Sequence, residues 1–109
     1  MAAKPTPRVR MPSTAKKDEV IEVKTLISHE METGLRKDSS GALIKRRIIK
    51  QFKASFNGKE VFRADWFPSV SANPYQSFFV RAAESGTFTF EWFDDDGSIY
   101  KHEQKLTVS

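Results

Sequence analysis

The strictest alternation of apolar and polar residues in this sequence runs from residue 87 to residue 93. Successive side chains of a β-strand point to opposite faces, so a period of two predicts a strand with one buried face. The apolar face of this strand carries three aromatic side chains, Phe88, Phe90 and Trp92. Such a face needs a second apolar layer to cover it, and the segment therefore favours a fold in which two sheets pack together.

The same alternation recurs along the chain between turn signals. A short first strand is predicted to begin near Val9 and to stop at Pro12, and the other predicted strands cover residues 19–27, 44–56, 60–66, 75–83 and 98–108. The pair Asn57-Gly58 predicts a tight hairpin, because both residues tolerate the positive φ of a type I′ turn. No longer window shows the 3.6-residue period of a helix. The prediction is an all-β fold, specifically an immunoglobulin-like antiparallel β-sandwich.

Composition agrees with one domain over residues 1–109, in which residues 1–17 form an extended, basic leader. The sequence has 109 residues, nine of them Phe, which suits an aromatic strand core. No apolar run approaches the ~20 residues that span a bilayer, and the first residues lack the apolar centre of a secretory signal. We therefore expect no membrane partner and no export signal in this chain.

Charge and cysteine content exclude several classes of function. The formal net charge is +4, but the basic residues are spread along the chain except for the run Lys45-Arg46-Arg47. No base-reading motif accompanies that charge, so we expect no nucleic-acid partner. The sequence contains no cysteine, which excludes disulfides, thiolate metal sites and a cysteine nucleophile.

The acidic run Asp94-Asp95-Asp96 raises the question of a metal site. Calcium loops alternate their acidic residues, whereas these are contiguous, lie between predicted strands and precede Gly97, so they are predicted to form a turn. His29 is predicted to be a solvated or hydrogen-bonded loop residue and His102 an exposed strand residue, and two distant histidines do not make a zinc site. Without a phosphate-binding loop or a nucleophile motif either, we expect no metal, no cofactor and no enzyme activity.

Two regions are candidates for binding a protein partner. Residues 28–47 form a long charged loop with His29 and with Met31, which we expect to be exposed, and this loop is either a plain connection or a recognition loop. The second region brings Trp66 and Phe67, before Pro68, together with Tyr75, after Asn73-Pro74. Those aromatic residues either cap the core or anchor a partner, since Trp and Tyr are common at interface hot spots. The predicted partner interface thus contains His29, Met31, Trp66, Phe67 and Tyr75.

Several segments, in this order and spacing, resemble the SoxZ family of bacterial sulphur oxidation proteins. They are PRVRMP at 7–12, EVIEVKTLISHEMETG at 19–34, the FNGK-VF-AD segment at 56–65, SANPYQSFF at 71–79 and ESGTFTFEWFDDDGS at 84–98. The resemblance implies an immunoglobulin-like sandwich and a non-catalytic role. A stand-alone sandwich that binds a ligand or a protein is the alternative.

The resemblance also implies a partner and a compartment. In the family, the SoxY subunit carries sulphur intermediates on a cysteine of a flexible arm, and SoxZ forms a stable heterodimer with SoxY. The heterodimer then makes transient contacts with other Sox enzymes during thiosulfate oxidation. The family works in the periplasm, and its members are thought to be exported together with SoxY, so a periplasmic location is expected here.

Overall fold

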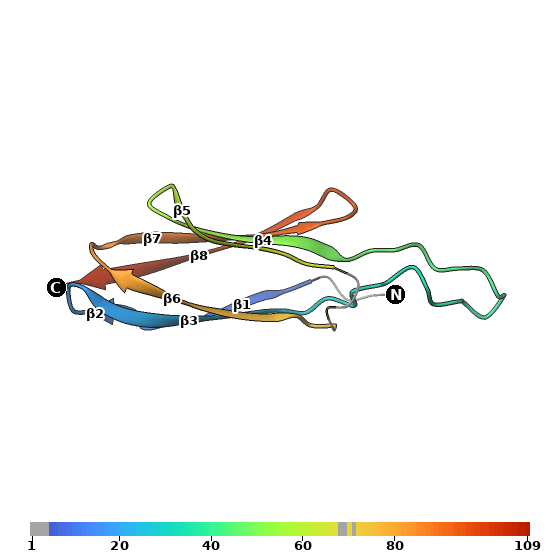
Figure 1. Cartoon of the computed structure of the whole chain (residues 1–109), viewed down its shortest axis with the longest axis horizontal. Helices are drawn as coiled ribbons and strands as arrows, with labels where there is room; N and C mark the ends of the chain where they lie inside the picture. The colour runs from blue at the N-terminus through green and yellow to red at the C-terminus, as the bar shows by residue number, and fades with distance from the viewer. Residues whose placement is uncertain (1–4, 68–69, 71) are drawn as a thin grey trace.

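The fold is an all-β sandwich of two stacked sheets, seen in a computed structural model that describes residues 5–67, 70 and 72–109 (Figure 1). No helix occurs in these residues, and none is long and apolar enough to cross a membrane. The strands are β1 (Pro7–Arg10), β2 (Thr14–Ala15), β3 (Glu19–Ile27), β4 (Ile49–Phe56), β5 (Lys59–Asp65), β6 (Tyr75–Ala82), β7 (Gly86–Asp94) and β8 (Ile99–Val108).

The two sheets have three and five strands, in the orders β1-β3-β6 and β2-β8-β7-β4-β5. All strand pairs are antiparallel except the two-residue β2, which runs parallel to β8. The β4–β5 hairpin turns at Asn57-Gly58, where φ is 51° and 83°, as the sequence predicted. The predicted immunoglobulin-like antiparallel sandwich is therefore confirmed.

Aromatic rings fill the space between the sheets. The alternation predicted for β7 is observed, since the side chains of Phe88, Phe90 and Trp92 are fully buried. Phe52 on β4 lies beside them in the same sheet, opposite Trp92, with its ring 5.2 Å from that of Trp92 and 6.2 Å from that of Phe78 in the other sheet. Each strand thus contributes every second residue to one common core.

Part of the segment predicted as a basic leader is built into the sandwich. Strand β1 ends at Arg10, before Pro12, and pairs with β3. The following strand β2 pairs with β8, and Ala15 is buried there. Residues 1–4 of the predicted leader lie outside the described residues.

A long arm, residues 28–48, joins β3 to β4 and reaches beyond the end of both sheets (Figure 1). Its two sides pair at Glu32 with Arg47 and at Lys37 with Leu43. The predicted strand at residues 44–56 is therefore too long. Strand β4 begins at Ile49, because the backbones of Ile44 and Arg47 bond across the arm to Arg36 and Glu32 instead of to β7. A bulge between Ile49 and Gln51 follows, and both Ile48 and Ile49 are buried.

Gly86 at the start of β7 gives a first prediction. A Cβ at this position would collide with the side-chain amide of Asn57, whose Oδ1 accepts the Thr87 N–H at 2.9 Å. Gly86→Ala should displace that amide and lower the unfolding free energy by about 1–2 kcal/mol. Urea denaturation measures the loss, and in an Asn57→Gly background the same change should cost much less. Equal losses in both backgrounds would contradict this explanation.

Candidate functional site

The acidic run lies in the turn between β7 and β8. Gly97 adopts a positive φ of 89°, and the N–H of Asp94 donates to the carbonyl of Ser98 at 2.9 Å. The predicted turn is confirmed, but Asp94 is 1% exposed, which a turn alone does not explain. Within the described residues, no three His, Cys, Asp or Glu side chains are grouped so that they could hold a metal ion.

Asp94 is the centre of a buried hydrogen-bond network. Its Oδ2 accepts a hydrogen bond from His29 Nε2 at 2.8 Å and another from the Tyr100 hydroxyl at 2.8 Å. The Met31 N–H donates to His29 Nδ1 at 2.9 Å, so Nδ1 carries no proton and the ring proton is on Nε2. Burial, and then the bond to Asp94, raises the pKa of Tyr100, which keeps its hydroxyl a donor.

Two of the three arginines of the arm, Arg46 and Arg47, connect it to the same turn. Arg46 donates two hydrogen bonds to Asp95, from Nε to Oδ2 at 2.8 Å and from Nη2 to Oδ1 at 3.0 Å. Arg47 donates from Nη2 to the Tyr100 hydroxyl at 3.0 Å, and its Nε lies 3.4 Å from Asp94 Oδ2. The basic run and the acidic run, far apart in sequence, therefore neutralise each other where the arm leaves the sandwich.

This network holds the arm against the sandwich. The side chains of His29 and Asp94 are 3% and 0% exposed, so both groups lie away from solvent. The backbone of His29 is also held, because its N–H donates to Asn73 Oδ1 at 3.0 Å and its carbonyl accepts the Asn73 N–H at 2.7 Å. The network thus joins three loops at one end of the sandwich.

We expect Asp95 to cause part of the loss of stability of this fold in acid. The hydrogen bond from Arg46 holds the pKa of Asp95 below its ordinary value of 3.8. The unfolded chain therefore binds more protons, so the stabilisation is complete above that value and is lost as the pH falls through the folded-state pKa. Urea unfolding between about pH 6 and about pH 3 measures this loss. Asp95→Asn and Arg46→Gln should both flatten the profile, and an unchanged profile in both would contradict the assignment.

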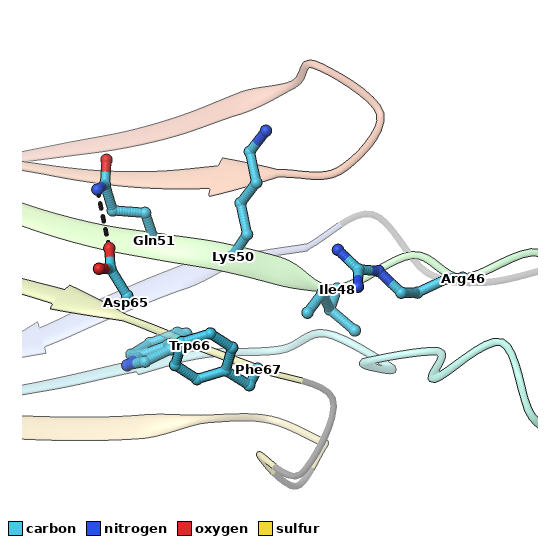
Figure 2. Close-up of a pocket in the computed structure, with 7 residues that line it drawn as sticks. All are labelled: Arg46, Ile48, Lys50, Gln51, Asp65, Trp66 and Phe67. Atoms are coloured by element: carbon cyan, nitrogen blue, oxygen red, sulfur yellow. Dashed lines mark hydrogen bonds between the residues drawn. The ribbon is translucent and has the colours of Figure 1, made fainter.

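A groove of about 380 Å³ lies beside the end of β5 (Figure 2). Trp66 stacks on Phe52 with ring centres 5.9 Å apart, and the Phe67 ring beside it is 64% exposed. Across the groove stand Arg46 and Lys50, labelled in Figure 2. The exposed Phe67 ring can pack against an apolar side chain of a partner. The two cations beside it do not select a partner side chain of a particular shape.

The predicted interface residues have two different environments. His29, Met31 and Trp66 are buried, at 7%, 4% and 7% exposure, whereas Phe67 and Tyr75 are exposed. The expectation of an exposed Met31 is wrong. The backbone of Met31 has a positive φ of 53°, and its side chain is turned inward so that the sulphur accepts a hydrogen bond from the Ile49 N–H at 3.3 Å. That these residues contact a partner stays a prediction. The three buried ones expose little surface for such a contact.

Other predictions can be compared with the structure in the same way. The reading of His29 as hydrogen-bonded is confirmed, while its solvated alternative is wrong. His102 is half-buried rather than exposed, with its ring 6.3 Å from that of Phe90. Pro68, the last residue of the predicted aromatic edge, lies outside the described residues.

Sequence reasoning missed three exposed apolar residues of the three-stranded sheet, Val20, Leu26 and Phe79. The alternation of the sequence could have predicted their exposure, because each of them points to the face opposite to that of the core residues of its strand.

Comparison with protein families identifies the chain. The sequence model of the sulphur oxidation protein SoxZ matches residues 9–105. This chain belongs to the SoxZ family. No curated protein matches it. The family membership confirms the resemblance drawn from the sequence segments, and it places the chain in a family of sulphur oxidation proteins.

Solved structures share the fold of this SoxZ-family chain. The superoxide reductase (neelaredoxin) from Ignicoccus hospitalis aligns with a TM-score of 0.72 and 16% identity, over 95% of this chain and 80% of that one. A putative superoxide reductase from Thermotoga maritima aligns with a TM-score of 0.70 and 20% identity, over 94% and 85%. The sulfur carrier protein SoxY from Chlorobium limicola f thiosulfatophilum aligns with a TM-score of 0.66 and 14% identity, over 94% and 74%. At such identities the likeness concerns the fold alone.

Proposed function

We propose that this chain is the non-catalytic scaffold subunit of a heterodimeric sulphur-carrier complex. In this role it binds a SoxY-type subunit stably, supports it, and helps to present its substrate-bearing cysteine to other Sox enzymes in thiosulfate oxidation. The match of the SoxZ family over residues 9–105 is the observation that carries the proposal. The absence of cysteine from this sequence agrees with it, because a thiol-bound sulphur intermediate then belongs to the partner.

The structure offers a physical basis for a scaffold. Its core is packed with aromatic rings, and its buried histidine–aspartate pair lies away from solvent. A carrier that visits several enzymes needs a rigid base and one stable contact, beside weaker ones that dissociate easily. The polar and charged arm is available for the weaker contacts, which salt should modulate.

Co-expression with the SoxY-type protein of the same genome tests the proposal. We expect a stable one-to-one complex in gel filtration with light scattering at micromolar concentration. Thiosulfate oxidation reconstituted from purified Sox enzymes should require the complex and should not be supported by this chain alone. Absence of a complex would contradict the proposal. Turnover of thiosulfate by the isolated chain would contradict its non-catalytic part.

We further propose a periplasmic location, reached together with the partner. Cell fractionation of a tagged chain, with and without the gene of the SoxY-type subunit, measures this. The chain should reach the periplasm when the partner is present and stay in the cytoplasm when it is deleted. A cytoplasmic location in both strains would contradict co-export.

A further inference from the structure

The outer face of the three-stranded sheet exposes large apolar side chains. Alternate residues of β3 and β6 point away from the core, and a solvated sheet face usually carries polar residues there. The exposed apolar side chains are Val20, Leu26, Tyr75 and Phe79, which are 59%, 37%, 58% and 68% exposed. An exposed group of this kind is typical of a protein-binding surface.

Strand register places these side chains in one stripe along the face, interrupted between its two ends by the Lys24–Ser77 pair. Leu26 on β3 lies directly opposite Tyr75 on β6, and Glu22 lies opposite Phe79. Val20 lies two positions from Glu22 on the same strand face, so it is the diagonal neighbour of Phe79. At about 3.3 Å per residue, Tyr75 and Phe79 are roughly 13 Å apart along β6. Strand β6 pairs only with β3 and forms one edge of the sheet, so the stripe runs along that edge.

Cations flank the apolar stripe. A groove of about 350 Å³ is lined by Arg8, Arg10 and Lys24, together with Leu26 and Tyr75. Lys24 lies 3.7 Å from Glu22, which leaves the face with an excess of positive charge.

The arginines of this face differ from the others in the chain. Those elsewhere are paired: Arg36 with Glu32, Arg46 with Asp95, Arg47 with Asp94 and Asp96, and Arg63 with Glu60. Arg8, Arg10 and Arg81 make no side-chain hydrogen bond or ion pair with any described residue. All three are exposed on the outer side of this one sheet.

The outer face of the five-stranded sheet provides an internal comparison. There, Gln51 donates to Asp65 at 3.0 Å, and Lys101 lies 3.9 Å from Glu91. Some charged groups of that face therefore pair within it, whereas Lys105 has no partner among the described residues and Ile99 is 48% exposed there. The three-stranded sheet differs in degree, because four exposed apolar side chains and three unpaired arginines share its outer face.

We propose that the outer face of the β1-β3-β6 sheet is the docking surface for the SoxY-type subunit. The complementary surface on that subunit carries apolar side chains at its centre and carboxylates around them. The apolar stripe supplies the buried centre of the contact, and the unpaired guanidinium groups pair with the carboxylates at its rim. This inference rests on the proposed function, because it names the surface through which the proposed partner binds.

The first test removes the apolar centre. The double variant Tyr75→Ser/Phe79→Ser should weaken binding to the purified SoxY-type subunit by roughly tenfold or more in calorimetric titration. Its folding should be unaffected, since both side chains are largely exposed, and a thermal melt checks this. The matched control, Leu35→Ser/Leu43→Ser, removes two exposed leucines from the arm and should bind like the unmodified chain.

The second test reverses charge. Arg8→Glu/Arg10→Glu should weaken binding by roughly tenfold at low salt and by less at high salt, because rim charges are screened. The control Lys59→Glu/Lys105→Glu makes the same change in net charge on the five-stranded sheet and should leave the affinity within roughly twofold. Equal losses for the two pairs would show a general effect of net charge and would overturn the assigned face.

Failure of this inference is distinguishable from failure of the proposed function. If the unmodified chain forms the complex and the stripe variants bind equally well, the docking surface is wrong and the scaffold function stands. If the arm variants lose binding instead, the surface is also wrong. If the unmodified chain forms no complex, both proposals fail. If the chain self-associates and the stripe variant abolishes only that, the face joins two copies of this chain and the inference is overturned.

Discussion

Replacing Phe52 by alanine is expected to lower the unfolding free energy by about 3–5 kcal/mol, the usual cost of removing a buried phenylalanine ring. Phe52 is 0% exposed and lies on the central part of β4. Its ring stacks on Trp66 and Phe90, with centres 5.9 and 6.4 Å away, and contacts the ring of Trp92 at 5.2 Å.

Guanidinium denaturation followed by tryptophan fluorescence measures this loss. The matched control is Phe79→Ala, which removes the same ring from an exposed position and should change the unfolding free energy by less than about 0.5 kcal/mol. Similar losses for the two variants would contradict the core assigned to this sandwich.

Replacing Asp94 by alanine is expected to cost about 3–5 kcal/mol as well, for an electrostatic reason. The variant leaves the buried Nε2–H of His29 and the Tyr100 hydroxyl without their acceptor, and it removes the carboxylate beside Arg47. Buried donors without acceptors keep their full desolvation cost. For a domain of this size, the melting temperature should fall by at least about 12 °C.

Differential scanning calorimetry tests this prediction. Asp94→Asn retains one acceptor oxygen and should lose less than the alanine variant. Asp96→Ala is the positional control, because that neighbouring carboxylate is exposed and should cost roughly 1 kcal/mol or less. A melting temperature that falls equally for Asp94→Ala and Asp96→Ala would mean that the turn, and not the buried network, stabilises this end of the sandwich.

The strands could be predicted from the sequence because the cues for them are local. The alternation of residues 87–93 and the pair Asn57-Gly58 each act within a few residues, and both were predicted correctly. The prediction failed at residues 44–48, which alternate like a strand. Arg47 in this segment pairs with Glu32 on the other side of the arm, and this pairing depends on a contact across fifteen residues of sequence.

The candidate site could be predicted only in part. Tyr75 and Phe67 are exposed, as an interface requires, and each stands next to a proline in the sequence. Met31 looked like an exposed loop residue, because nothing near it in sequence shows that its side chain turns toward Ile49. Asp94 likewise looked like its two acidic neighbours, since no local pattern separates a buried carboxylate from an exposed one in the same turn.

The sequence by itself determined the extended backbone, the turns and the inward side of each strand, because these follow from the geometry of a residue and its immediate neighbours. Its segments also determined the family. Only the tertiary structure decided that Asp94 meets His29 across 65 positions of sequence, and that unpaired arginines and exposed aromatic rings share one sheet face. Such encounters depend on the register and order of strands, which long-range packing sets.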